Sequence, residues 1–241
     1  MEEYFLRRCV TSDDAASSPG DTTQLPLSAW QSTGRAERVL VQENRQAHGA
    51  SRAILSAIVD LTLQSPRTSA VVLFTLLTHL DYSGDVTNFQ LPQASSSGST
   101  PSSSHLLTKI LDDINLFEVK AALDSGGSRR IEDDGRPSRP IVVVLDSINV
   151  LLQQFSLQRV LFFLRQLHSH LLIGSVIIRL NAGAEPAQVA QVLAAQATAV
   201  VLVETQSSLR AYPLLSKERR REIPQGKHGF VLLVRQKKVS K

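Results

Sequence analysis

The sequence predicts a doubly wound α/β domain, in which a mostly parallel sheet carries helices on both faces. Short Val- and Ile-rich runs alternate with helical patterns, most clearly in the second half of the chain. Uniformly apolar strands separated by helices are typical of parallel sheets that are buried on both sides. The chain has 241 residues, of which 42% are hydrophobic, and this is enough to form one such core.

The first half of the chain is predicted to hold two strands and two helices. A short strand is expected at residues 38–42 and a buried strand at Ala70–Leu77. Between them, apolar residues recur at the spacing of one helical face, which predicts a helix over 51–63. A second helix is expected over 105–123, where apolar residues form a stripe and charged residues lie outside it.

The second half repeats a strand–helix pattern. In chain order we expect a strand at 141–146, a helix at 157–171, a strand at 174–180, a helix at 186–196 and a strand at 199–204. Pro186 suits the first turn of its helix, where a missing N–H breaks no helical hydrogen bond. A last strand at 229–234 is predicted to pair antiparallel with the segment 209–214.

Composition divides the chain into a tail, a domain and its loops. The N-terminal part is rich in Ser, Thr, Asp, Gly and Pro, and residues 1–36 are expected to form a flexible tail before the domain at 37–241. A Ser-rich loop at 92–104 and a charged, Gly- and Pro-rich loop at 124–140 have too few apolar residues to offset their ordering entropy. A basic segment at 216–241 closes the sequence.

The formal net charge of +4 is unevenly distributed. The segment 216–241 holds nine Lys or Arg and two Glu, a balance of +7, which leaves −3 for the other residues. Such a run is typical either of a solvated face or of contact with an anion or nucleic acid. Few aromatic residues accompany it, so only backbone contact is predicted. The candidate RNA-backbone contacts are Lys217, Arg219, Arg220, Arg221, Lys227, Arg235, Lys237 and Lys238.

The chain is expected to be intracellular. The expected location is the cytoplasm, and the nucleus is a further location that the sequence leaves open. Its N-terminus begins acidic and lacks the basic and apolar regions of a secretory signal. No apolar stretch reaches the roughly 18 residues that a membrane span needs, so no membrane contact is predicted. Cys9 is the single cysteine, which excludes an internal disulfide and a Cys-based zinc site.

An acidic residue ends the predicted strand at 141–146. An apolar strand that ends in Asp is the pattern of the residue that helps to hold Mg²⁺ in nucleoside-triphosphate-binding folds, where ligands lie beyond the carboxyl ends of parallel strands. Asp146 therefore occupies a Walker-B-like position, without expected catalysis. In the alternative interpretation, Asp146 or Ser147 merely caps the helical segment that begins at Ile148.

The phosphate-binding loop that should accompany such an aspartate is missing. That loop needs a glycine-rich turn and a Lys followed by Ser or Thr, so that backbone N–H groups and an ammonium surround the phosphates. Residues 42–52 read QENRQAHGASR, with one glycine, no lysine, and Glu43 where an anion would lie. Arg45 or Arg52 could replace the lysine, but Glu43 argues against a phosphate cradle. We therefore expect a nucleotide-binding layout with a dead pocket and no cofactor.

No other group of residues predicts catalysis or a metal. His168 and His170 are two residues apart, so on a helix they do not form the i, i+4 pair of a metal site, and we expect them at the surface near a helix C-terminus. His79 and Asp81 would act as an acid/base pair only with a third, orienting group. Ser147 lacks the flanking glycines of a nucleophile elbow. We expect no catalytic residue and no metal ligand.

Three segments together resemble the fifth subunit of the Elongator complex. The stretch IVVVLDSINVLL at 141–152 is similar to that family's strand ending in Asp-Ser-(Ile/Leu/Val)-Asn before a Leu-Leu pair. GASRAIL at 49–55 resembles its degenerate loop and first helix, and residues 226–238 resemble its final basic strand. The resemblance covers roughly residues 37–239.

This resemblance implies a RecA-like fold without functional Walker motifs, which assembles with the fourth and sixth Elongator subunits into a heterohexameric ring. It implies binding or release of tRNA in support of wobble-uridine modification, while the chemistry takes place in the Elongator catalytic core. Alternatives are the sister sixth subunit, or a RecA or recombinase paralogue that binds single-stranded DNA. A third alternative is an enzyme that uses His79 and Asp81.

Overall fold

The structure is a computed structural model. It describes residues 36–47, 49–64, 70–75, 86–90, 107–114, 140–205, 207–208 and 229–235. The predicted tail up to residue 35, the Ser-rich loop, most of the charged loop, and most of the basic segment lie outside these residues.

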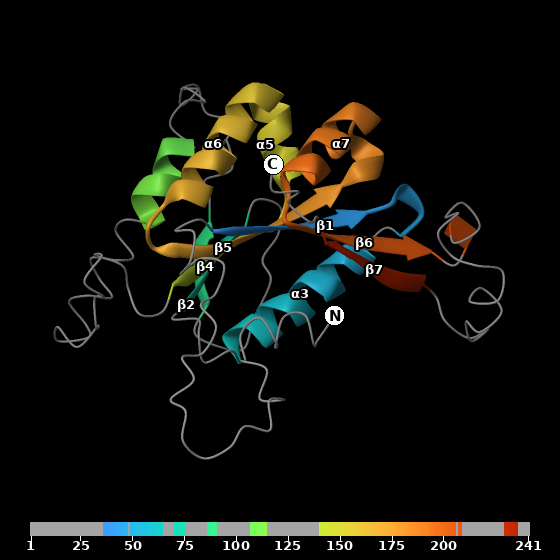
Figure 1. Ribbon diagram of the computed structural model, residues 1–241, viewed down its shortest axis with the longest axis horizontal. Helices are drawn as coiled ribbons and strands as arrows, with labels where there is room; N and C mark the ends of the chain where they lie inside the picture. The colour runs from blue at the N-terminus through green and yellow to red at the C-terminus, as the bar shows by residue number, and fades with distance from the viewer. Residues whose placement is uncertain are drawn as a thin grey trace, which may run out of the picture.

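The described residues form a mixed α/β fold around a seven-stranded sheet (Figure 1). Its strands are β1 (Glu37–Glu43), β2 (Ala70–Thr75), β3 (Val86–Gln90), β4 (Ile141–Leu145), β5 (Ile173–Asn181), β6 (Ala199–Thr205) and β7 (Gly229–Arg235). They lie in the order β3-β2-β4-β5-β1-β6-β7. Every neighbouring pair is parallel except β6 with β7, so the prediction of a mostly parallel sheet is confirmed.

Helices cover both faces of this sheet, as Figure 1 shows. One face carries α3 (Ala50–Leu63), and the other carries α5 (Ile148–Gln154), α6 (Leu157–Ser169), α7 (Ala187–Gln196) and a helix at 107–114. Two 3-10 turns, η1 (Arg45–Ala47) and η2 (Ala182–Ala184), follow β1 and β5. The doubly wound arrangement is therefore confirmed.

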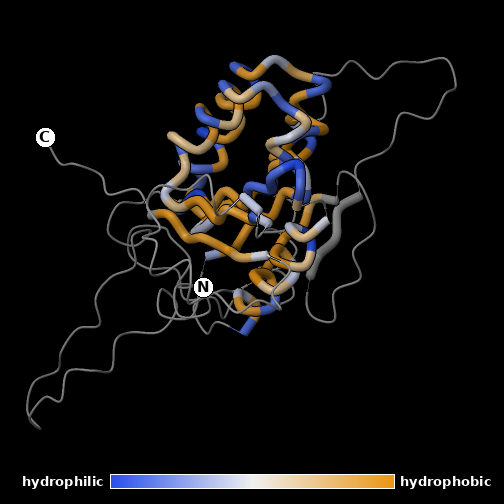
Figure 2. Tube along the Cα trace, turned by 90° about the vertical axis from the view of Figure 1, so that its right-hand side faces the viewer, coloured by the Kyte–Doolittle hydropathy of each residue, from blue (hydrophilic) through white to orange (hydrophobic). Residues whose placement is uncertain are grey.

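The strands divide their apolar side chains between two cores. In β4, Val142 and Val144 pack in the core that contains α3, whereas Val143 and Leu145 pack in the core of α5, α6 and α7. Successive side chains of a strand point to opposite faces, so a central strand of such a sheet must be apolar at nearly every position. Figure 2 shows hydrophobic colouring along the central strands and mixed colouring along the helices.

The predicted strands and helices that fall on described residues are present, with shifted ends. The strand expected up to residue 77 is described to Thr75, the helix expected over 105–123 is described at 107–114, and the helix expected to reach residue 171 ends at Ser169. Ala36, assigned to the tail, is instead buried, and its N–H donates to the carbonyl of His168 at 3.0 Å. None of the described helices is long and apolar enough to cross a membrane.

Three features of the fold differ from the sequence prediction or were missed. β7 pairs antiparallel with β6 along its whole length, and the segment 209–214, which we expected as its partner, lies outside the described residues. The parallel sheet would otherwise end at β6, whose outer edge supplies the hydrogen-bonding groups that β7 needs. The short strand β3 was not predicted, and the short helix α5 was expected only in the alternative interpretation of Asp146 and Ser147, since neither element is long enough to show a clear period.

Two neighbouring phenylalanines of α6 allow a test of which face of this helix packs in the core. Phe163 is 1% exposed and Phe162 is 61% exposed. Phe163→Ala is expected to lower the free energy of unfolding by about 3–5 kcal/mol, because it leaves a cavity in the core. Phe162→Ala is expected to change it by at most about 0.5 kcal/mol. Urea unfolding of both variants measures the difference, and equal losses would contradict the packing described.

Candidate functional site

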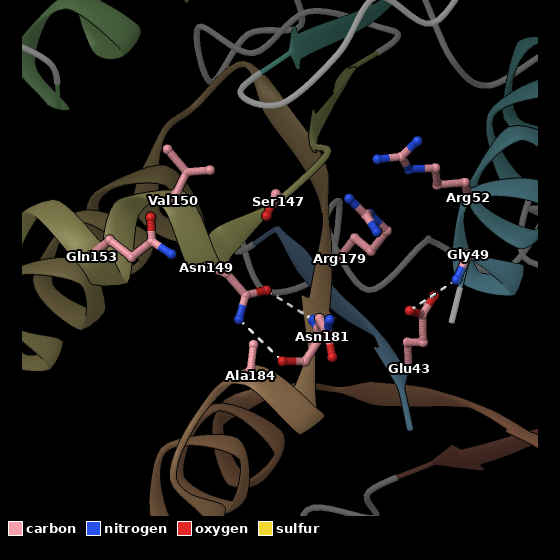
Figure 3. Close-up of a pocket in the computed structure, with 10 residues that line it drawn as sticks. All are labelled: Glu43, Gly49, Arg52, Ser147, Asn149, Val150, Gln153, Arg179, Asn181 and Ala184. Carbon is pink, nitrogen blue, oxygen red and sulfur yellow. Dashed lines mark hydrogen bonds between the residues drawn. The ribbon is translucent and has the colours of Figure 1, made fainter. Parts of the chain in front are cut away.

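The loops that leave β1, β4 and β5 meet at the carboxyl edge of the sheet. β1 and β5 are neighbours, but β1 leads into α3 on one face and β5 leads to α7 on the other. Ligands of open α/β sheets bind in the crevice outside the carboxyl ends of the strands at such a switch point. A pocket of about 300 Å³ lies here (Figure 3), lined by Glu43, Gly49, Arg52, Ser147, Asn149, Val150, Gln153, Arg179, Asn181 and Ala184.

The carboxylate of Glu43, the last residue of β1, binds the first turn of α3. It accepts hydrogen bonds from the N–H of Gly49 at 3.1 Å and from the N–H of Ser51 at 3.0 Å. The hydroxyl of Ser51 donates to the same carboxylate. The first N–H groups of a helix have no intrahelical acceptor and bind anions readily. Glu43 therefore occupies the position that a bound phosphate would need.

The loop between β1 and α3 turns back so that this contact can form. Gly49, the residue before the helix, has a φ of +88°, a conformation that glycine adopts without strain. Glycine has no side chain to cap the helix, and Glu43 supplies the missing acceptor from six residues upstream. The single glycine of this loop thus serves the contact with Glu43.

A buried arginine completes the network on the other side of Ser51. Arg179 lies in β5 and is 7% exposed. Its Nη1 donates to the hydroxyl of Ser51 at 3.3 Å, and its Nε donates to the backbone carbonyl of Asp146. The contacts of Glu43, Ser51, Arg179 and Asp146 therefore tie together β1, α3, β5 and the end of β4.

The surroundings of Glu43 favour its ionised form. Burial by itself raises the pKa of this carboxyl, but the hydrogen bonds from Ser51 and Gly49 and the charge of Arg179 outweigh burial. The pKa of Glu43 is therefore lowered below its ordinary value of 4.5. At neutral pH the cradle at the start of α3 is filled by a fixed negative charge.

A second network fixes the opposite wall of the pocket. The side-chain amide of Asn149, in α5, exchanges two hydrogen bonds with the backbone of Asn181 at the end of β5, at 2.9 and 3.1 Å (Figure 3). Its Nδ2 also donates to Glu185 Oε1 at 2.9 Å. The side chain of Asn181 caps η2 by accepting the N–H of Gly183 at 3.0 Å. Both walls of the pocket are thus held by internal hydrogen bonds.

The two arginines considered as substitutes for a phosphate-binding lysine lie in different places. Arg52 is exposed in the first turn of α3 and lines the pocket. Arg45 is exposed in η1 and does not line the pocket. It packs against Gly183 in η2, so closely that a Cβ added to this glycine would lie 2.6 Å from the Cβ of Arg45. Of these two, only Arg52 is placed to contact a ligand in the pocket.

The Walker-B-like residue is buried beside the site. Asp146 is 1% exposed and is not among the residues that line the pocket. Its N–H donates to the carbonyl of Phe74 at 3.3 Å, which holds the end of β4 against β2. Ser147 stands at the N-cap of α5, as the structural alternative expected, but its side chain makes no capping hydrogen bond.

Other predicted residues are only partly within the described structure. His168 lies in the last turn of α6 and His170 is its C-cap, as expected, although both are half-buried rather than at the surface. Arg235 ends β7, and its side chain is outside the description. Within the described ranges, no group of three or more His, Cys, Asp or Glu could hold a metal ion. The other positions lie outside the described residues: Cys9, His79, Asp81, Lys217, Arg219, Arg220, Arg221, Lys227, Lys237 and Lys238.

Arg179, Ser51 and the contact between Asn149 and Asn181 were not predicted from the sequence. A signal for Arg179 was present, because it is the one charge in the predicted strand 174–180 and a buried charge needs a partner. The contacts of Asn149 and Ser51 depend on how the loops meet in space. No periodicity of the sequence shows them.

Comparisons with known proteins give distant structural likenesses. No family model and no curated protein matches the sequence. Among solved structures, uncharacterized protein PH0321 from Pyrococcus horikoshii, in complex with an unknown peptide, has a TM-score of 0.49 and 14% identity over 83% of this chain and 84% of its own. The pCW3 conjugation coupling protein TcpA, with ATPγS, has a TM-score of 0.43 and 13% identity over 82% of this chain and 59% of its own.

The cytoplasmic domain of EssC is a third likeness, with a TM-score of 0.36 and 16% identity over 70% of this chain and 31% of its own. This chain therefore spans less than two thirds of TcpA and of the EssC domain. At such scores and identities, none of these proteins assigns a family or a function. The class of protein, a doubly wound α/β domain, follows from its own strand order and helix layers.

The lowered pKa of Glu43 makes its contribution to stability depend on pH. Glu43→Gln is expected to cost about 1–3 kcal/mol at pH 7, because the Gln amide cannot accept from all three donors. The contribution is present above the unfolded pKa near 4.5 and is lost as the pH falls through the lower folded value. Urea unfolding of wild type and variant from pH 7 to pH 3 measures it.

Glu204→Gln is the matched control for this prediction. Glu204, at the end of β6, is also buried, and it accepts from Asn44 Nδ2 at 2.7 Å, which a Gln carbonyl can also do. Its cost is expected to be smaller than that of Glu43→Gln. A gap between wild type and Glu43→Gln that widened towards acid pH would contradict the network.

Proposed function

We propose that this chain is a non-catalytic, RecA-like subunit of the Elongator complex, corresponding to its fifth subunit. In this proposal it forms a heterohexameric ring with the fourth and sixth subunits. The ring binds or releases tRNA in support of wobble-uridine modification. The chain itself holds no nucleotide and performs no chemistry.

The filled anion cradle at α3 is the observation that carries this proposal. A subunit that hydrolysed a nucleoside triphosphate would need those N–H groups for phosphate and a lysine beside them. Here Gly49 and Ser51 donate to Glu43, and the loop contains no lysine. A nucleotide phosphate would have to displace a buried carboxylate that Arg179 helps to neutralise. These contacts favour a binding or scaffolding role over catalysis.

The topology is compatible with this proposal. The central strands lie in the order β2-β4-β5-β1-β6. Strand β1 therefore stands between β5 and β6, which come after the Asp-bearing strand β4 in the chain. The pocket lies at the carboxyl edge beside β1, where a doubly wound fold binds its ligand.

The residues of the Elongator resemblance have structural roles at this edge. The Asp-Ser-Ile-Asn run leads from β4 into α5, and its Asn149 holds the end of β5. A run of this kind fits a family that retains the architecture of the edge without its chemistry. This fit supports the fifth subunit over an ordinary recombinase, in which a lysine-bearing loop is needed.

The native mass of the complex tests the proposal directly. Co-expression of the full chain with the fourth and sixth Elongator subunits from the same source is expected to give a stable assembly with two copies of each subunit. Native mass spectrometry measures its composition. A chain that stays alone, or that displaces the sixth subunit, would contradict the assignment and favour the recombinase or the sister-subunit alternative respectively.

The basic segment tests the RNA-binding part of the proposal. Replacing Arg219, Arg220 and Arg221 with Ala is expected to weaken tRNA binding and to reduce the slope of log Kd against log salt. The slope should fall by roughly one for each phosphate that the variant no longer neutralises. Filter binding of the assembled ring across salt concentrations measures both quantities.

A control variant removes three exposed charges elsewhere, by replacing Lys109, Arg159 and Arg165 with Ala. It is expected to leave the affinity and the slope close to wild type. If both triple variants behave alike, the basic segment is a solvated face.

A further inference from the structure

We infer that the carboxylate of Glu43 takes the place of an external anion at the start of α3 and keeps such anions out. We call this tethered carboxylate the plug. The inference deepens the proposed absence of nucleotide binding. It stands on the geometry around Glu43 and needs no Elongator partner.

The carboxylate is bound as an external oxyanion would be. One oxygen accepts the N–H of Gly49, and the other accepts both the N–H and the hydroxyl of Ser51. Glu43 is 1% exposed and Ser51 is fully buried, so water does not compete for these donors. Three donors from one turn therefore converge on one negative group.

A positive charge lies beside the plug, on the neighbouring strand. Arg179 approaches the same hydroxyl of Ser51 and is itself more than nine-tenths buried. In the register of β1 with β5, Val41 stands beside Arg179, so Arg179 lies on the same face of the sheet as Val41 and Glu43. That face carries α3. Loss of the carboxylate would leave the N–H groups of Gly49 and Ser51 without this acceptor, beside the buried guanidinium of Arg179, and this is a site prepared for a free anion.

The pocket gives a free anion its route. Glu43 and Gly49 both line the cavity of about 300 Å³, and the exposed Arg52 stands at its rim (Figure 3). Removing the Glu43 carboxylate connects the vacated position to this cavity. In the wild type the same route ends at a negative charge that repels any further anion.

Chemical rescue by formate tests the plug. Glu43→Ala in the full chain is unfolded thermally in sodium formate, sodium acetate or sodium phosphate, and in sodium chloride of equal ionic strength. Formate at about ten times its dissociation constant is expected to raise the Tm of Glu43→Ala by roughly 3–6 °C over chloride. Wild type is expected to show the same Tm in formate as in chloride.

Glu204→Ala is the matched control, because it also removes a buried carboxylate at the carboxyl end of a neighbouring strand, one bound by the side chain of Asn44. It is expected to gain nothing from formate over chloride. An equal gain in both variants, or none in Glu43→Ala, would overturn the plug.

Amide exchange in the wild type covers the case in which Glu43→Ala does not fold. The N–H of Ser51 is expected to exchange at least about 100-fold more slowly than that of the exposed Ala50 in the same turn. Equal rates would overturn the inference. Both measurements use the isolated chain, so their failure is separate from that of the proposed Elongator assembly, which the native mass decides.

Discussion

The carboxyl edge of this sheet depends on one constraint: the buried carboxylate of Glu43 must find hydrogen-bond donors away from water, and the start of α3 supplies them. Glu43 and Arg179 stand on neighbouring strands and reach a common partner, the hydroxyl of Ser51. An uncompensated charge at either position would cost several kcal/mol. The contacts of Glu43 with Gly49 and Ser51 therefore hold the start of α3 against the end of β1. Arg179 links the same hydroxyl to the backbone carbonyl of Asp146 at the end of β4.

The periodicity of the sequence was sufficient for the layers of the fold. A strand buried on both faces has to be apolar throughout, and a helix that covers a sheet has to show one apolar face, so most strands and helices could be predicted with ends displaced by a few residues. Which strands pair with each other could not be predicted from periodicity. β7 joins β6 because that edge is open in three dimensions, and this pairing was not predicted. Proximity along the chain favours the segment 209–214 as a partner, and that segment lies outside the described residues.

Only one aspect of the candidate site could be predicted from the sequence. Glu43 at the end of a strand, with a single glycine and no lysine after it, argues against a phosphate cradle. The other aspect, that this carboxylate occupies the cradle, needed two facts that no spacing contains. One is the turn at Gly49, which brings the start of α3 back to β1, and the other is the register that puts Arg179 on the α3 face.

A tethered anion and a bound phosphate act differently on a protein, although they make the same contacts. A phosphate comes and goes, so the loops around it exist in two states whose balance follows the ligand concentration. The Glu43 carboxylate is part of the chain, and its effective concentration at the helix is fixed by a loop of six residues. While Glu43 stays ionised, the donors at the start of α3 have an acceptor at any ligand concentration. Under the proposed function, an edge held in this way suits a subunit whose task is to hold a fixed shape for its neighbours.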